Sequence, residues 1–458
     1  MAMKTYQVKG ILQQKSWLLN PFVTIDSKGK ITKIASKGTS DEYIDGYLLP
    51  GFQNAHSHAF QYAMSGLAEI HTHHSRKDDF WAWRHAMYEV ALSVNPEQLE
   101  SIAAMLYVEM LRNGYTSVAE FHYLHHDDQG LPYAHISELG ERLISAAKTT
   151  GIHITLIPIF YQKGGFGLPA ESHQRRFLSK DVDDYFRLLE ASSASITHYE
   201  NAQIGFGIHS LRAADKNSME RIFKEGPKDA PIHLHLAEQL KEVDACIDFY
   251  GERPAQWLLN QGILNERFHL IHCTHLNPQE VKGIATSQAQ VVLCPATEGN
   301  LGDGLFSLKA FQNQGGKWSI GTDSQINLNP IEELRILDYG QRTKTHDRAQ
   351  FTSEHQGDAG KFAIDMAWHS GQKAMGEKKS NFLAVGQSLD AVILNANAPL
   401  ISVSKPENIL ATLVYSGQPN DLMGTLVNGQ WVIKNQKHLN QEAVQTSFTK
   451  SMRQIKIR

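Results

Sequence analysis

The chain has 458 residues, of which 41% are hydrophobic and 20% are charged, and its formal net charge at pH 7 is −4. This composition is typical of a folded globular protein with room for one large domain and a smaller one. The weak negative charge gives no reason to expect nucleic acid or a membrane surface as a partner, and no run approaches the roughly 18 apolar residues of a membrane span. The three cysteines, Cys246, Cys273 and Cys294, are too dispersed for a disulfide framework or a cysteine metal site, which favours a reducing cytoplasm.

Residues 1–50 have the pattern of short strands joined by turns. Two alternating apolar runs flank Ser27-Lys28-Gly29, as two strands flank the turn of a hairpin. We therefore expect this end of the chain to contribute strands to a β-rich unit.

From about residue 51 the pattern changes to eight short apolar runs that alternate with helical segments. The runs are rich in Val, Ile and Leu without polar alternation, as is typical of parallel strands that are covered on both faces. They lie at 47–56, 117–123, 153–161, 203–210, 231–238, 267–275, 290–298 and 318–324. Eight strand–helix repeats predict an α/β fold, a (β/α)8 TIM-type barrel over residues 51–375. A doubly wound open sheet is the competing fold, but no Gly-rich phosphate loop follows the first run to support it.

Strand-like runs return near the C-terminus, at 390–394 and 425–435, the second with Asn428-Gly429 as its turn. Because both ends of the chain have this β pattern, we expect residues 1–50 and 376–458 to form one small β-sandwich domain. The barrel would then be inserted between the two parts of that domain.

Polar residues follow the expected strands at their C-terminal ends, which is the face where barrel enzymes carry their chemistry. They are His56, His58, Tyr123, His209, His235, Glu238, His272 and Asp323. The connection over residues 60–95 is long for a barrel loop, so we expect it to cover this face.

The pair His56 and His58 is the first indication of a metal site, because residues i and i+2 of a strand project to the same side. Alone this indication is weak, since the chain holds two further pairs of the same spacing, His71/His73 and His233/His235. The other strand-end residues strengthen it. Neutral imidazoles with one carboxylate form a donor set suited to zinc, with iron or manganese as alternatives.

The order His56-x-His58, His235 with Glu238 three residues later, His272 and Asp323 resembles the amidohydrolase superfamily, in its branch with one metal ion and aminohydrolase activity. The resemblance implies the same barrel and terminal β-sandwich. It implies one divalent metal ion, expected to be Zn²⁺, held by His56, His58, His235 and Asp323. It also implies three catalytic residues: Glu238 as the proton shuttle, His272 in contact with the hydrolytic water, and His272 or Asp323 as the acceptor of the first proton.

Within this superfamily, five segments resemble the deiminases that act on N-formimidoyl-L-glutamate in histidine degradation: residues 50–69, 80–84, 119–123, 209–212 and 297–304. The resemblance implies hydrolysis of a C–N bond to N-formyl-L-glutamate and ammonia. The substrate carries two carboxylates, which arginine binds bidentately. By this resemblance the substrate contacts are Gln61, Arg84, Tyr123, His209 and Arg212.

Some positions depart from the expected pattern, and two other functions stay open. Gln325 stands where a histidine is expected, and Gly299 and Ser307 replace an alanine and a proline. The alternatives are a deaminase of a heterocycle such as guanine, which would need paired arginines less, and a non-catalytic barrel that serves as a scaffold. A small-molecule substrate is the expected partner, without nucleic acid or membrane. A homodimer is expected only because proteins of this architecture commonly associate.

Overall fold

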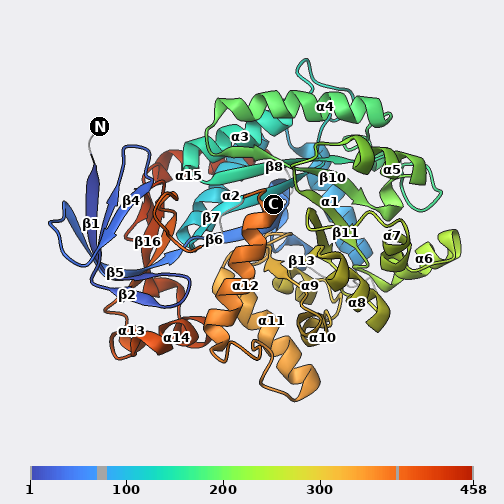
Figure 1. Ribbon diagram of the computed structural model, residues 1–458. Helices are drawn as coiled ribbons and strands as arrows, with labels where there is room; N and C mark the ends of the chain where they lie inside the picture. The colour runs from blue at the N-terminus through green and yellow to red at the C-terminus, as the bar shows by residue number, and fades with distance from the viewer. Residues whose placement is uncertain (1–2, 70–79, 378–380, 456–458) are drawn as a thin grey trace.

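The computed structural model describes residues 3–69, 80–377 and 381–455, and two nine-stranded sheets organise these residues (Figure 1). Within them, no helix combines the length and the apolar character that crossing a membrane requires. One sheet forms a parallel barrel in the middle of the chain, and the other joins both ends of the chain.

The barrel confirms the predicted α/β fold. Its neighbouring strands are all parallel, and nearly every residue in them is buried, which explains why their sequences lack polar alternation. In chain order they are β6 (Phe52–Ser57), β7 (Tyr115–His122), β8 (His153–Phe160), β10 (Phe206–Ser210), β11 (Ile232–Leu236), β12 (Phe268–His272), β13 (Gln290–Leu293) and β14 (Trp318–Ile320), with the short β9 (Ala202–Ile204) paired to β8.

Hydrogen bonds between the first and last strands close the barrel. Thr322 N and Asp323 N donate to His56 O at 3.1 and 3.0 Å, and His58 N donates to Asp323 O at 3.2 Å. The Asn54 side chain adds two bonds to Thr322, donating to its hydroxyl at 2.8 Å and accepting from its backbone N at 3.0 Å. Closure therefore brings Asp323 directly against the His56–His58 pair.

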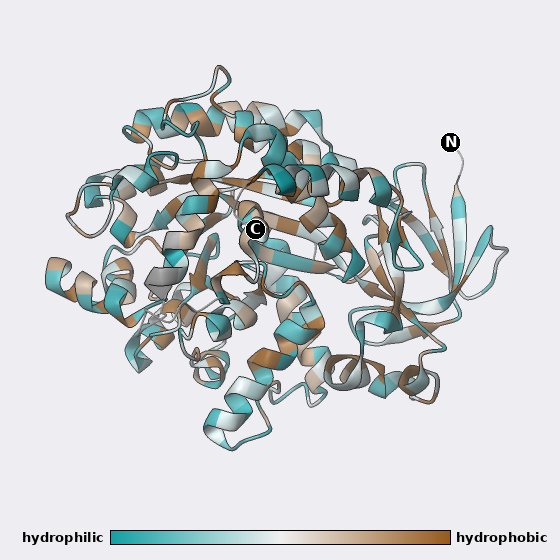
Figure 2. Cartoon of the chain, turned by 180° about the vertical axis from the view of Figure 1, so that it is seen from behind, coloured by the Kyte–Doolittle hydropathy of each residue, from teal (hydrophilic) through white to brown (hydrophobic). Residues whose placement is uncertain are grey.

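Helices cover the outside of the barrel, and Figure 2 shows hydrophilic and hydrophobic residues alternating along these helices. The helices are α1 (Phe80–Ser93), α2 (Pro96–Arg112), α3 (Glu138–Thr150), α4 (Val182–Ser195), α5 (Lys216–Glu225), α6 (Leu240–Tyr250), α7 (Pro254–Asn260), α8 (Pro278–Ser287), α9 (Pro295–Asn300), α10 (Leu308–Asn313), α11 (Pro330–Thr345) and α12 (Ala359–Ala374). The barrel connections also contain short 3₁₀ turns: η1 (Ala59–Met64), η2 (Leu67–Glu69), η3 (Ser172–Gln174), η4 (Ile196–His198) and η5 (Leu211–Ala213).

The second sheet confirms that both chain ends build one β unit. Its order is β18-β17-β16-β15-β5-β1-β3-β4, with β2 paired to β1, so the N-terminal strands lie beside the C-terminal ones (Figure 1). The strands are β1 (Lys4–Leu12), β2 (Trp17–Leu19), β3 (Phe22–Ile25), β4 (Ile31–Ala35), β5 (Glu42–Pro50), β15 (Ala391–Asn395), β16 (Leu422–Val427), β17 (Gln430–Lys434) and β18 (Lys437–His438). The two halves meet where β5 pairs antiparallel with β15. Tyr6, Val8, Leu48 and Ile393 belong to the small apolar core of this sheet.

The expectation that residues 47–56 form one strand is wrong, because this run divides between the two sheets. Strand β5 ends at Pro50 and β6 begins at Phe52. A Cβ atom on the intervening Gly51 would lie 2.2 Å from the Thr116 side chain, so only glycine fits at this crossing. The division into a barrel at 51–375 and a terminal domain at 1–50 and 376–458 is our proposal, and this crossing supports its first boundary.

The C-terminal segment also contains helices, which return to the barrel. They are α13 (Pro399–Ser402), α14 (Ile409–Ser416) and α15 (Gln441–Gln454), with the turns η6 (Pro406–Asn408) and η7 (Pro419–Asp421). Helix α15 packs on α2, where Ser101 Oγ donates to Ser451 Oγ at 2.6 Å. The terminal domain is therefore joined to the barrel by helix packing as well as by the chain.

Candidate metal centre and active site

Four side chains converge at the C-terminal mouth of the barrel, and all four are buried. The ligand atoms of His56, His58, His235 and Asp323 lie within 4.8 Å of one another. The Nε2 atom of His56 lies 3.1 Å from that of His58 and 3.2 Å from that of His235. The Oδ1 atom of Asp323 lies 3.5 Å from His56 Nε2 and 3.3 Å from His58 Nε2.

The hydrogen bonds on the far side of two rings indicate which nitrogens face this centre without a proton. His58 Nδ1 lies 3.1 Å from Phe121 O, and His235 Nδ1 lies 2.9 Å from His209 O. A ring nitrogen beside a carbonyl oxygen must donate, so in the neutral rings Nε2 carries a lone pair. Lone pairs that face one another at about 3 Å repel unless a cation lies between them.

The donor set fits a divalent metal ion. A tetrahedral ion with bonds of about 2.0–2.1 Å holds its ligand atoms about 3.3–3.4 Å apart, close to the spacings found here. Burial, with the nearby His58, lowers the pKa of His56 to about 3, so this imidazole is neutral at pH 7. Burial acts to raise the pKa of Asp323, but its contacts with His56 and His58 hold that pKa well below its usual value. Neutral imidazoles and an ionised carboxylate are the forms that bind metal.

Glu238 and His272 lie beside these four residues. His272 Nε2 is 3.7 Å from Glu238 Oε1 and 3.6 Å from Asp323 Oδ2, while its Nδ1 is 3.2 Å from Glu298 Oε1. Burial acts to lower the pKa of His272, but the surrounding carboxylates raise it to about 10. Burial raises the pKa of Glu238. Several buried carboxylates around one imidazole leave excess negative charge, which a divalent cation would offset.

The residues predicted to bind substrate line the same small cavity of about 40 Å³. Its wall is formed by His58, Gln61, Trp83, Arg84, Met87, Tyr123, His209, Arg212, His235, Glu238, His272, Leu301 and Asp323. Every predicted site residue is on this wall except His56, which is fully buried. The cavity therefore combines the acid–base groups, part of the donor set and two guanidinium groups.

Contacts among the predicted substrate residues hold several of them in place. Gln61 Nε2 donates to Tyr123 OH at 3.0 Å, and Arg212 Nε donates to Ser210 Oγ at 3.3 Å. The ring of His209 lies 5.3 Å from that of Tyr123, measured between centroids. Arg84 reaches the cavity from α1, so the predicted cover over residues 60–95 does contribute to the wall. Residues 70–79 of that segment lie outside the described residues.

Two further cavities clarify the position of the site. A cavity of about 540 Å³ shares Arg84 and Arg212 with the inner one, so the two arginines separate a small reactive space from a larger outer one.

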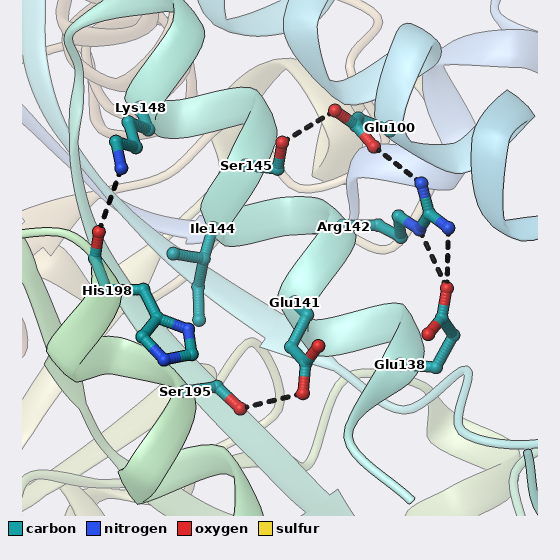
Figure 3. A pocket seen from close by; sticks show the side chains of 9 residues that line it. All are labelled: Glu100, Glu138, Glu141, Arg142, Ile144, Ser145, Lys148, Ser195 and His198. Atoms are coloured by element: carbon teal, nitrogen blue, oxygen red, sulfur yellow. Dashed lines mark hydrogen bonds and ion pairs between the residues drawn. The ribbon is translucent and has the colours of Figure 1, made fainter. Parts of the chain in front are cut away.

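Another cavity, of about 310 Å³, lies among α2, α3 and α4 (Figure 3). Arg142 forms ion pairs with Glu100 and Glu138 in this cavity, and no predicted site residue lines it.

Sequence reasoning gave no role to two buried carboxylates near the site. Glu298 contacts His272, as described above. Glu120 accepts from Ser57 Oγ at 2.9 Å and Ala59 N at 2.6 Å, which braces the chain on both sides of His58. Glu298 lies in the first turn of a helix and Glu120 in an apolar strand. Both belong to segments that resemble the deiminases, 297–304 and 119–123, but the resemblance assigned neither carboxylate a role. Only the proximity that the barrel creates identifies them.

Gln325, found where a histidine is expected, has a structural part in this arrangement. Its Nε2 donates to Ser57 Oγ at 3.0 Å and to Asp323 O at 2.7 Å, and its Oε1 accepts from Thr322 Oγ1 at 2.8 Å. The Gln325 side chain thus links the turn that contains Asp323 to β6 by hydrogen bonds. Gly299 and Ser307 lie outside the cavity wall, in α9 and just before α10.

Comparison with known proteins shows similarity along nearly the whole chain. A sequence model described as "Amidohydrolase family" matches residues 47–432. The formimidoylglutamate deiminase of Pseudomonas aeruginosa is 38% identical over 97% of this chain and 98% of its own length. A 5-methylthioadenosine/S-adenosylhomocysteine deaminase of Thermodesulfovibrio yellowstonii is 26% identical over 85% of this chain and 81% of its own.

Solved structures agree with this similarity. The crystal structure of an amidohydrolase from Brucella melitensis superposes with a TM-score of 0.93 at 37% identity, covering 99% of each chain. An adenosine deaminase from Xanthomonas campestris with bound zinc gives a TM-score of 0.82 at 19% identity, over 99% of this chain and 98% of that one. At that lower identity the likeness shows the fold alone.

Proposed function

Because this chain belongs to the amidohydrolase family, we propose that it is a metal-dependent deiminase that hydrolyses N-formimidoyl-L-glutamate to N-formyl-L-glutamate and ammonia. It is a hydrolase that acts on a C–N bond. The 38% identity to the deiminase of Pseudomonas aeruginosa, over nearly the full length of both chains, supports this substrate.

One observation carries the proposal: a single cavity combines the acid–base pair Glu238 and His272 with two arginines. N-formimidoyl-L-glutamate has a small formimino head and two carboxylates. The head fits the small inner cavity, and guanidinium groups at its border suit the carboxylates. A heterocyclic substrate would use no such pair of cations, and a scaffold would have no need for the buried acid–base groups.

The roles of the residues follow from their surroundings. His56, His58, His235 and Asp323 would hold the metal ion, which when bound lowers the pKa of water from about 15.7 toward about 7 and so makes water a nucleophile at neutral pH. Glu238 Oε1 lies 3.7 Å from His272 Nε2, so these atoms can share the protons that the reaction moves. Water adds its oxygen to the formimino carbon, and Glu238 carries a proton to the nitrogen that leaves as ammonia. Arg84 and Arg212 orient the glutamate part.

Three finer statements belong to the same proposal. We propose Zn²⁺ as the metal, because three imidazoles and a carboxylate suit it. We propose a role in histidine degradation, since the proposed substrate is an intermediate there. We propose the cytoplasm as the compartment, because all three cysteines are free and buried, as is common in reducing surroundings. The homodimer stays a prediction. Light scattering on the purified protein measures the molar mass in solution and so tests it.

Ammonia release from the zinc-loaded protein tests the activity. N-formimidoyl-L-glutamate is offered beside guanine, 5-methylthioadenosine and free formamidine. We expect turnover of the glutamate compound alone, a loss of at least about 100-fold in kcat in Glu238→Gln, and full activity in the control Glu220→Gln, whose side chain is on the exterior. Turnover of a heterocycle instead would refute the proposed substrate. A metal-loaded protein without activity on any of these compounds would refute the proposal that the chain is a deiminase.

A further inference from the structure

A carboxylate outside the predicted set contacts the imidazole of His272 on the side away from the reaction. Glu298 Oε1 lies 3.2 Å from His272 Nδ1, and the side chains of both residues are almost wholly buried, with 6% and 1% of their surface exposed. The opposite nitrogen of the ring, Nε2, lies near Glu238 and Asp323 and has no hydrogen-bond partner among the residues that the structure describes. The ring therefore spans the distance between Glu298 and the reactive cavity.

We propose that Glu298 is a positioning residue for the reaction. Its carboxylate accepts a hydrogen bond from Nδ1–H of His272 and thereby fixes Nε2 as the nitrogen that faces substrate. This inference rests on the proposed function, since it concerns the same site.

The surroundings of Glu298 make it well suited to hold the ring. Its Oε1 also accepts from Cys294 N at 2.9 Å, and its own N donates to Cys294 O at 2.9 Å, so the carboxylate is fixed at the start of α9. Asp303 N donates to Glu298 O at 2.9 Å and ties the following loop to the same residue. A carboxylate fixed in this way has few alternative orientations. The hydrogen bond to it therefore restricts the orientation of the His272 ring as well.

His272 needs such a contact because its backbone does not orient it in the ordinary way. Its φ angle is +70°, and the next residue, Cys273, also has a positive φ of 53°. In the register of the sheet it is Ile271, not His272, that pairs with His235. A regular strand would thus turn Ile271 toward the face of His235 and His272 away from it. The left-handed backbone and the bond to Glu298 together direct this ring into the cavity.

The experiment compares two buried carboxylates that cap the same helix. Glu298 accepts from Cys294 N, whereas Glu333 accepts from Ala296 N at 2.9 Å and from Asn327 Nδ2 at 2.9 Å, without contacting a histidine of the site. We expect Glu298→Ala to lower kcat about 10- to 100-fold with KM changed less than about threefold, because losing the partner of a functional histidine has effects of that size. Glu333→Ala serves as the matched control and should keep kcat within about threefold, although both variants lose stability.

Glu298→Gln tests the role of the hydrogen bond with little change in shape. Its amide oxygen can still accept from His272 Nδ1 and Cys294 N, so kcat should recover to within about tenfold of wild type. Equal kcat losses in Glu298→Ala and Glu333→Ala would overturn the proposal, because the carboxylate would then act only through folding. No recovery in a well-folded Glu298→Gln protein would overturn the hydrogen-bond role.

A second measurement does not depend on turnover. In metal-loaded, ¹⁵N-histidine-labelled protein, the His272 resonances are assigned by their loss in His272→Asn. We expect a protonated Nδ1 in wild type and a change in its ¹⁵N shift in Glu298→Ala, with the shift unchanged in Glu333→Ala. An Nδ1 signal unaffected by Glu298→Ala would overturn the positioning role. If the wild type releases no ammonia from the glutamate compound, the proposed function fails, and this spectrum still decides the role of Glu298.

Discussion

At the ends of the barrel strands, Ala237, His272, Cys273 and Asp323 have positive φ angles of 51°, 70°, 53° and 47°. Residues with a side chain rarely adopt this conformation, which costs about 1–3 kcal/mol each. Each of them lies in or next to the proposed catalytic set. The cost is offset by the fixed surroundings: Asp323 N donates to His56 O, and Cys273 N donates to Leu236 O at 3.0 Å. Strain of this kind is common where a protein holds side chains in one functional geometry.

The two arginines allow a prediction about substrate binding. Arg84→Ala and Arg212→Ala should each raise KM for N-formimidoyl-L-glutamate about 10- to 100-fold, because a lost charge-assisted hydrogen bond is worth about 1.5–3 kcal/mol. Steady-state kinetics of ammonia release measure this. Arg187→Ala, which removes an exposed guanidinium from α4, is the control. Unchanged KM in both cavity variants would show that the carboxylates bind elsewhere.

Glu333 allows a prediction about pH. Burial raises its pKa well above the usual value. An acid whose pKa is raised by folding stabilises the protein below its unfolded pKa, and that stabilisation is lost as pH rises through the folded pKa. The free energy of unfolding of wild type should therefore fall relative to that of Glu333→Gln between about pH 5 and 8, by at most about 1.4 kcal/mol per pH unit. Urea unfolding across this range measures the difference, and a difference independent of pH would contradict the prediction.

Among the helices, α2 shows how local sequence supports the barrel. Asn95 Oδ1 accepts from Gln98 N at 2.8 Å, Gln98 Oε1 accepts from Asn95 N at 3.0 Å, and Pro96 occupies the first helical position. This reciprocal cap satisfies backbone donors that the helix itself leaves unpaired. Because α2 packs on both α3 and α15, its N-terminus supports contacts to the barrel and to the C-terminal segment.

Removing this cap should affect stability without affecting the reaction. Asn95→Ala is expected to lower the free energy of unfolding by about 1 kcal/mol, within a usual range of about 0.5–2 kcal/mol, and to leave kcat and KM unchanged. Denaturant unfolding and the ammonia assay measure the two quantities. Gln98→Ala removes the other half of the cap and should also lower the free energy of unfolding while leaving kcat and KM unchanged. A changed kcat or KM in either variant would contradict this prediction, because the N-terminus of α2 would then affect the geometry of the site.

Over the whole molecule, the proposed metal ligands come from three parts of the chain. His56 and His58 lie at the first barrel strand, His235 in β11 and Asp323 after β14. An ion bound by all four would therefore link the two strands that close the barrel to β11, which lies between them. Such an ion binds the folded chain only, so it stabilises the fold by mass action, by about 2.7 kcal/mol at 100 times its dissociation constant.

Metal removal should accordingly lower the thermal unfolding midpoint and abolish ammonia release, and added Zn²⁺ should restore both. Calorimetry with and without chelator, together with metal analysis, measures this. Asp323→Asn is the informative variant, because it keeps the side-chain shape and weakens the donor set. Its midpoint should respond less to zinc than that of wild type. An equal response in the two proteins would exclude Asp323 as a ligand.

The fold class and much of the candidate site could be predicted from the amino-acid sequence alone. Eight apolar runs were sufficient to predict the barrel, because strands buried on both faces need continuous apolar sequence. The pair His56 and His58 could be recognised because alternation along a strand relates neighbouring positions directly. The strand-end residues could be grouped because parallel strands in a barrel share one mouth.

The remaining features could not be predicted from the sequence, because the contacts involved join distant parts of the chain or break the regular strand pattern. The division of residues 47–56 between two sheets depends on the close approach of Thr116 to Gly51. The bond between Glu298 and His272 depends on the pairing of β12 with β13 and on a left-handed backbone at His272, neither of which leaves a local signal. Periodicity describes which face a residue occupies within one element, whereas the partner of a buried polar group is set by which elements the fold brings together.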